Sequence, residues 1–171
     1  MWLNSHYLKT LDFEEIMKYL SKFIPESWLG NMKFLKRVWD IEKERVRTLA
    51  EFQTISRFFF ELPEYPKERL LWKNASPENT EYVLGAVAAS LGALGESDFS
   101  REHLEKIVAE IADKHGRGEV FWPLRVALSG EEASPPPIDI ALVLGKNETL
   151  QRIRHAIRRL AGQKQDSSIF T

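Results

Sequence analysis

Apolar residues recur every three or four positions along nearly the whole chain, which is the spacing of one face of an α-helix. Such stripes run through residues 13–23, 35–49, 52–59, 83–94, 104–112 and 150–160. No segment shows a convincing period of two, and the short apolar run 140–144 lacks the partner segments that a buried strand needs. The pattern therefore predicts an all-α fold.

Several predicted helices start at residues whose side chains accept hydrogen bonds from free backbone N–H groups. Asp12 and Thr48 each precede a glutamate by three residues, which is the spacing of a capping box. Ser76, which is followed by a proline, and Ser100 are the other expected N-caps. We expect Gly116 and Gly118 to close the helix that Ser100 begins.

One segment interrupts the helical pattern and indicates a boundary. Residues 61–79, ELPEYPKERLLWKNASPEN, are rich in turn-forming residues and in charge. We therefore expect two small helical subdomains, 1–68 and 69–171, joined within residues 61–77.

Composition excludes several classes of protein. Lys and Arg number 24 against 25 Asp and Glu, so bulk charge does not argue for nucleic-acid binding and any such site needs local clustering. The absence of cysteine excludes disulfides, thiolate metal sites and a cysteine nucleophile. No apolar run approaches the ~20 residues of a membrane span, and residues 1–15 lack the pattern of a signal peptide. We expect a soluble cytoplasmic protein that does not bind membranes.

The sequence lacks the common motifs of catalytic sites. It contains neither a glycine-rich phosphate loop nor the G-x-S-x-G motif of a serine nucleophile. The histidines show no metal-ligand spacing: they are His6, His103, His115 and His155. We therefore expect no catalytic residue, no metal site and no bound cofactor in this chain.

Positive charge gathers in two segments. Residues 33–49 alternate cations with acids, including an expected ion pair between Lys36 and Asp40. The last helix, within 149–164, presents several arginines with almost no acids. Each segment is interpreted either as a solvated helix face or as a basic face that contacts RNA phosphates.

The stretch FWPLRVALSG, residues 121–130, combines two costly features. Pro123 stands inside a predicted helix, at a cost of about 3 kcal/mol, and frees a backbone carbonyl one turn earlier. Arg125 is a lone cation in an apolar run. A freed carbonyl and a guanidinium together offer the acceptor and donors that recognise an unstacked RNA base. Trp122 either stacks on a base or packs in the core.

These residues resemble a known family. FWPLRVALSG, followed by a proline loop and IDIALVLGKNETLQRIRHAI, is similar to the C-terminal anticodon-binding region of bacterial glutamyl-tRNA synthetases. NSHYLKTLDFEEI at residues 4–16 resembles the segment that follows the catalytic core in that family, and ERVRTLAEF at 44–52 resembles its E-R-x-x-T-L stretch.

The resemblance implies a function for the parent protein. It implies a class I aminoacyl-tRNA synthetase that attaches glutamate to its tRNA with ATP and Mg²⁺, both held by a catalytic domain outside this chain. This chain is then the part that binds the anticodon loop of glutamate tRNA, as two all-α subdomains forming an α-helix cage. We expect it to be a monomer.

The resemblance also assigns site residues. Arg45 matches the arginine that contacts the third anticodon base, and Arg125 matches the one that contacts the anticodon from the second subdomain. The loop after Gly130 lies where the family holds the first anticodon base, although three consecutive prolines here replace the usual smaller residues and stiffen it. The expected anticodon contacts are Arg45, Pro123, Leu124, Arg125, Ser134 and Pro137. The expected contacts to the RNA backbone are Arg47, Lys146, Arg152 and Arg154.

Two other functions compete with this interpretation. A degenerate synthetase paralogue would keep the fold as a helical protein-interaction module without RNA function, using the stripe 83–94 and the aromatics Phe58, Phe59 and Phe60. A related class I synthetase for another amino acid is the third alternative. Arg45 favours a glutamate-specific parent, and a parent that also charges glutamine tRNA stays open.

Overall fold

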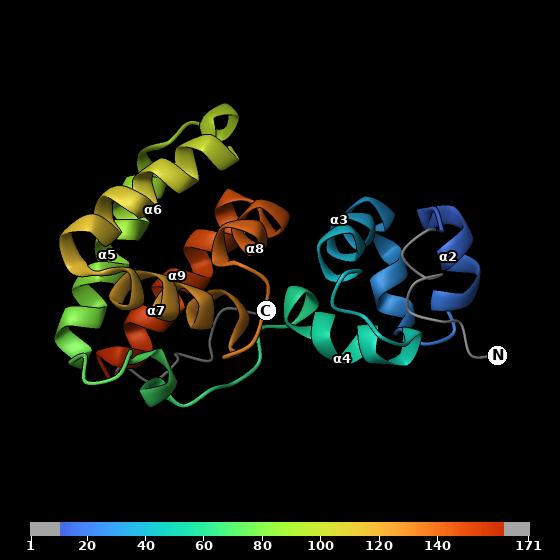
Figure 1. Ribbon diagram of the computed structural model, residues 1–171, viewed down its shortest axis with the longest axis horizontal. Coiled ribbons are helices and arrows are strands. Elements are labelled where there is room, and N and C mark those ends of the chain that lie inside the picture. Colours follow the sequence, from blue (N-terminus) through green and yellow to red (C-terminus); the bar gives the residue numbers. More distant parts are fainter. Residues whose placement is uncertain (1–10, 163–171) are drawn as a thin grey trace, which may run out of the picture. The chain divides into compact units, whose positions relative to one another are not determined.

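The computed structural model describes residues 11–162 (Figure 1). Within this range every regular element is an α-helix or a 3₁₀-helix, which confirms the predicted all-α class. The motif residues Asn4 and Tyr7 lie outside the described residues. The chain divides into two compact units, one ending at Leu62 and the other beginning at Pro63.

The described part of the first unit, residues 11–62, contains three α-helices and a 3₁₀-helix. These are α2 (Phe13–Leu20), η1 (Glu26–Gly30), α3 (Met32–Glu42) and α4 (Leu49–Phe60). Helix α4 packs against α2 and α3. Aromatic rings fill the core: Trp28 stacks on Phe60 with ring centroids 3.8 Å apart, and Trp39 lies 5.4 Å from Phe52.

The stretch 35–49 was predicted as one long helical segment, and this prediction is wrong. Helix α3 ends at Glu42, whose carbonyl accepts the backbone N–H groups of Arg45 (2.8 Å) and Val46 (3.1 Å). Thr48 then caps α4 by accepting the N–H of Glu51 (3.2 Å). The intervening turn buries Val46, so the apolar spacing continues through a segment that is not helical.

All four expected residues stand at the N-cap of a helix, and three of them make the capping hydrogen bond. Asp12 accepts the N–H of Glu15 (2.8 Å) and Ser76 accepts that of Asn79 (3.1 Å), as Thr48 does for Glu51. Ser100 makes no capping bond, because its hydroxyl is paired with Nδ1 of His103 at 2.9 Å.

The second unit contains the remaining helices. They are η2 (Lys67–Leu70), α5 (Pro77–Ala93), η3 (Glu96–Asp98), α6 (Arg101–His115), α7 (Arg117–Ser129), α8 (Pro137–Leu144) and α9 (Lys146–Leu160). Helix α5 packs along α9 and against α6 and α7, and α7 also contacts α8 and α9. The predicted stripe on α5 is buried here through Val83, Val87 and Leu91.

The segment after Leu62 belongs to the second unit. Tyr65 and Leu70 are buried, and the indole Nε1 of Trp122 donates to the carbonyl of Arg69 at 2.9 Å. Helix η2 accordingly packs on α7 and α9. The division therefore falls within the predicted joining segment 61–77 and before the expected boundary between residues 68 and 69.

Gly118 was expected to help end the preceding helix, and this prediction is wrong, because α7 already begins at Arg117. Its small size has another reason. A Cβ atom at Gly118 would lie 2.1 Å from Nε1 of Trp72. The glycine thus lets the Trp72 ring lie against the first turn of α7, where it also contacts Trp122 with ring centroids 5.3 Å apart.

Candidate functional site

Arg45, the expected contact to the third anticodon base, is paired with a buried acid. Its Nη1 donates to Oε2 of Glu42 at 2.7 Å. The Glu42 side chain is fully buried, whereas 33% of the Arg45 side chain is exposed. Burial raises the pKa of Glu42 to about 7, and the attraction of Arg45 opposes this rise. The Arg45 side chain thus extends from a buried partner to the solvent-exposed surface of the first unit.

The other charges of residues 33–49 behave as a solvated face. Lys36 pairs with Asp40 at 2.6 Å on an exposed stretch of α3, as expected from their spacing. Arg47 is exposed, and its backbone N–H donates to Oε2 of Glu51 at 3.0 Å. Arg45 differs from these residues because its acidic partner is withdrawn from solvent.

In the second unit, Arg125 joins α7 to the loop that follows it. Its Nη1 donates to the carbonyl of Ser134 at 3.3 Å, and the side chain is half-buried. Pro123 and Leu124 are buried in the core of this unit. Their side chains therefore shape α7 from within, and Arg125 is the residue of this motif that reaches the loop.

Loop 130–137 is held at both ends. Gly130 has φ of +71°, and a Cβ there would lie 2.6 Å from Cγ of Pro63. The Gly130 carbonyl accepts a hydrogen bond from Nη1 of Arg69 at 2.7 Å. At the other end, Pro137 is buried and occupies the first position of α8, where proline fits a helix well. The triple proline therefore serves in part as a helix start.

Trp122, which precedes the proline in this motif, packs inside the second unit. The hydrogen bond from its indole to the Arg69 carbonyl and its contact with Trp72 hold the ring in place. Arg69 thus contacts the middle and the C-terminal end of α7, because its carbonyl accepts from Trp122 and its guanidinium donates to the Gly130 carbonyl.

The four residues expected to contact the RNA backbone differ in accessibility. Arg152 is only 4% exposed, with Nη1 donating to the Leu128 carbonyl and Nε to Oε1 of Glu148, each at 2.7 Å. This places Arg152 in the interior instead of on the predicted basic face. Lys146 is half-buried and donates to the Leu94 carbonyl. Arg47 and Arg154 are exposed.

Sequence reasoning missed a second arginine contact on α9. Arg159 donates to the carbonyl of Tyr65 at 2.6 Å, lies over its ring at 5.0 Å and pairs with Glu64. Burial of the Tyr65 side chain raises the pKa of its hydroxyl to about 12. The signal available in the sequence was Tyr65 itself, a large aromatic residue between Pro63 and Pro66, because such a residue usually needs a packing partner. Arg159 anchors the 63–70 segment to α9.

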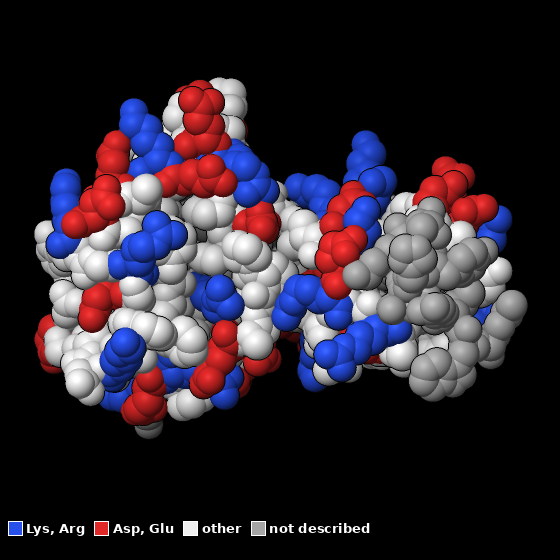
Figure 2. All heavy atoms as spheres, viewed as in Figure 1, with Lys and Arg blue, Asp and Glu red and all other residues white. Residues whose placement is uncertain are grey.

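The charges on the visible face of each unit are mixed. Figure 2 shows basic and acidic side chains interspersed there. Residues 11–162 hold no group of three or more His, Asp or Glu that could bind a metal. No helix in this range is long and apolar enough to cross a membrane.

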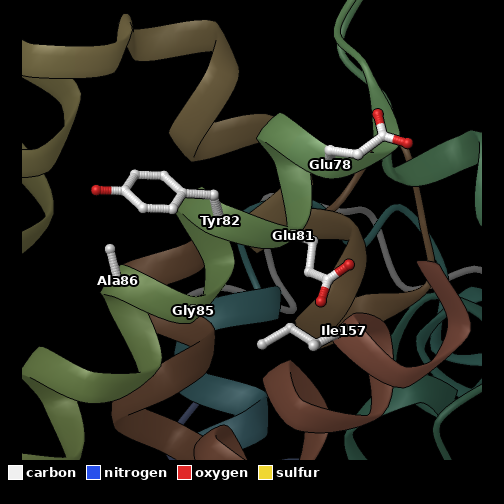
Figure 3. Close-up of a pocket in the computed structure, with 6 residues that line it drawn as sticks. All are labelled: Glu78, Glu81, Tyr82, Gly85, Ala86 and Ile157. Carbon is white, nitrogen blue, oxygen red and sulfur yellow. The ribbon is translucent and has the colours of Figure 1, made fainter. Parts of the chain in front are cut away.

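An open hollow of about 620 Å³ lies on α5, and α9 contributes Ile157 to its lining (Figure 3). Its polar side chains are Glu78, Glu81 and the exposed Tyr82. In Figure 3, Glu81 lies beside Ile157 and Tyr82 points away from it. Two carboxylates repel phosphate groups, so this hollow does not suit RNA.

The helical fold described above belongs to a known class of domain. The chain belongs to the anticodon-binding domain family, whose sequence profile matches residues 13–157.

The curated relatives of this chain carry a more specific name than the family does. The chain is 33% identical to a glutamate–tRNA ligase of Clostridium kluyveri over 97% of this chain and 34% of that protein. It is 34% identical to that of Thermodesulfovibrio yellowstonii over 92% of this chain and 35% of that protein. The chain thus spans about a third of the length of these relatives.

Solved structures share the fold. A glutamate tRNA ligase from Elizabethkingia meningosepticum, in complex with its amino acid, matches with a TM-score of 0.72 and 24% identity over 92% of this chain and 31% of that one. A glutamate-tRNA synthetase from Elizabethkingia anophelis matches with a TM-score of 0.69 and 26% identity over 92% and 30%. These matches show that the helical fold of this chain is shared with those structures.

Proposed function

We propose that this chain binds the anticodon loop of a glutamate tRNA as the C-terminal part of a glutamate–tRNA ligase. Glutamate attachment, with its ATP and Mg²⁺, belongs to a catalytic domain outside this chain. The family match over residues 13–157 and the named activity of the relatives support this assignment. The observation that carries it is Arg45, at the family's motif position, held at the surface by Glu42.

Arg45 has the chemistry to discriminate at the third anticodon base. A guanidinium only donates hydrogen bonds. The Watson–Crick edge of cytosine, the third anticodon base for glutamate, presents two adjacent acceptors, N3 and O2. Guanine, the third base for glutamine, presents donors at N1 and N2 in the corresponding place. RNA-binding proteins read these edges on unstacked loop bases, so Arg45 favours the glutamate anticodon.

Arg125 and the 130–137 loop supply the second group of contacts. The hydrogen bond from Arg125 to the Ser134 carbonyl fixes the loop relative to α7, and the loop prolines limit its motion further. A loop fixed in advance loses less conformational freedom when an RNA base binds beside it. In this proposal the guanidinium of Arg125 contacts the anticodon from α7, and Ser134 with the backbone around it contacts the first anticodon base. Pro123, Leu124 and Pro137 act by shaping the loop.

Contacts to phosphates make a smaller contribution. Arg47 and Arg154 are exposed, whereas Arg152 is buried and Lys146 is bound to a backbone carbonyl. Each phosphate that a cation neutralises steepens the salt dependence of binding by about 0.7–0.9 in a log–log plot. We therefore expect a shallow salt dependence and specificity that comes from base contacts.

The alternative of a protein-interaction module loses the features that suggested it. Phe58 and Phe59 are buried, Phe60 stacks on Trp28, and the stripe on α5 packs inside the second unit. The largest of these side chains are therefore taken up by packing within each unit. We accordingly propose a monomer that acts in the cytoplasm, where tRNA is charged.

The test is a salt-dependent titration of the chain against the anticodon stem-loop of glutamate tRNA. Arg125→Ala should weaken binding to this RNA by about 1–3 kcal/mol, the usual cost of losing one bidentate base contact, and leave binding to an unrelated hairpin unchanged. Equal weakening for both RNAs would mean that Arg125 contributes charge alone. Absence of binding at low salt would refute the proposed function.

A further inference from the structure

A buried carboxylate stands directly beneath the expected base-reading arginine. Glu42 is fully buried, and only one of its two carboxylate oxygens has a hydrogen-bond partner, which is Arg45. The other oxygen, Oε1, is buried without a partner. Such a group is unfavourable in a protein interior, so its presence calls for an explanation.

The position of Glu42 in α3 adds to this unfavourable environment. It is the last residue of that helix, where the helix dipole disfavours negative charge. Neighbouring pairs show the ordinary alternative, because Asp40 meets Lys36 in solvent. Buried ion pairs contribute little net stability, and an apolar residue of similar volume often serves folding better. Folding of the first unit therefore does not account for this glutamate.

We propose that Glu42 is the positioning residue of Arg45: its buried carboxylate and its backbone carbonyl together fix the direction in which the guanidinium meets the third anticodon base. This inference rests on the proposed function. Glu42 itself does not contact RNA.

Two contacts carry the proposal. The Glu42 carbonyl accepts the backbone N–H of Arg45 at 2.8 Å, and the Glu42 carboxylate accepts its Nη1 at 2.7 Å. One residue thus restrains both ends of the arginine. A free arginine side chain loses much rotamer freedom when it is immobilised on a ligand. An arginine already held by a buried partner loses less, and its planar fork approaches a base edge in one orientation.

Specificity depends on that orientation. A guanidinium that swings freely can also reach O6 or N7 of guanine, which are acceptors, and would then bind the wrong base. Holding Nη1 against Glu42 directs the side chain toward one position. Loss of Glu42 should therefore reduce the preference between bases more than it reduces the affinity for RNA in general.

The experiment measures the ratio of dissociation constants for two stem-loops that differ only in cytosine or guanine at the third anticodon position. Glu42→Gln keeps the size of the side chain and removes its charge. We expect the preference for cytosine to fall about 3- to 10-fold, the effect of immobilising one long side chain. Asp40→Asn, which breaks an exposed pair on the same helix, should leave the ratio unchanged.

A double-mutant cycle separates positioning from a general structural role. If Glu42 acts through Arg45, adding Glu42→Gln to Arg45→Gln should change the ratio no further. Glu42→Met, which is apolar and of similar length, should reduce the preference for cytosine as Glu42→Gln does. It serves as the second variant if the amide of Gln disturbs the packing of the first unit.

The outcomes distinguish this inference from the function on which it rests. An unchanged ratio in both folded Glu42 variants, or an equal loss in the Arg45→Gln background, would overturn the positioning role while anticodon reading stands. A wild-type chain that binds both stem-loops equally would instead refute anticodon discrimination itself.

Discussion

Replacing Glu42 by Gln should change how the stability of the first unit depends on pH. Burial raises the pKa of Glu42 from the usual 4.5 to about 7. One pKa unit corresponds to about 1.4 kcal/mol, so the folded state is penalised by about 3 kcal/mol when this carboxyl is fully ionised. Arg45 is the charged residue that opposes the penalty.

The direction of the effect follows from proton binding. Because the folded pKa lies above the unfolded one, the folded protein retains a proton that the unfolded chain releases. This stabilising contribution is complete below pH 4.5 and is lost as the pH rises through about 7. Between pH 5.5 and pH 8, Glu42 should therefore lower the free energy of unfolding by about 2 kcal/mol.

Urea unfolding at a series of pH values, followed by tryptophan fluorescence, measures this effect. Trp28 and Trp39 are buried in the same unit as Glu42 and report its unfolding. Other titrating groups, His155 among them, are common to both proteins and cancel in the difference. The stability of Glu42→Gln relative to wild type should rise by about 2 kcal/mol from pH 5.5 to pH 8. Parallel pH profiles for the two proteins would refute the account of Glu42 as a buried, weakly compensated acid.

Three further predictions concern the second unit. Gly118→Ala should destabilise it by about 1–3 kcal/mol in thermal unfolding, because the new methyl group meets the Trp72 ring; an unchanged melting temperature would show that the ring moves freely. Arg152→Met should cost about 1–3 kcal/mol in the same assay by leaving the buried Leu128 carbonyl without a donor, and it should leave the salt dependence of RNA binding unaltered. Arg154→Ala should instead weaken binding to both stem-loops alike and reduce the salt slope by about one, with stability as the unchanged control.

The helices could be predicted because their signals are local. The spacing of apolar residues and the caps at Asp12, Thr48 and Ser76 lie within a few positions of the backbone groups that they satisfy. The end of α3 at Glu42 could not be predicted in this way. The turn that follows buries Val46 at a position where a continued helix would also have placed an apolar residue.

For the candidate site, the sequence predicts residue types and says little about their surroundings. Motif matches select Arg45 and Arg125, but local sequence does not show which cations are buried. Arg152 resembles its exposed neighbour Arg154 in sequence, yet its partners Leu128 and Glu148 hold it inside the unit. The burial of Glu42 likewise arises from the packing of α3 on α4 and η1, which only the three-dimensional fold specifies.

The central claim is that Arg45 reads the third anticodon base, and one comparison tests it most directly. The dissociation constants of the chain for stem-loops with cytosine or guanine at that position should differ in favour of cytosine, and Arg45→Gln should abolish the difference. Arg57→Gln removes the same charge from an exposed arginine of the same unit and should preserve it. Equal binding of both stem-loops by the wild-type chain, or a preference that survives Arg45→Gln, would contradict the account.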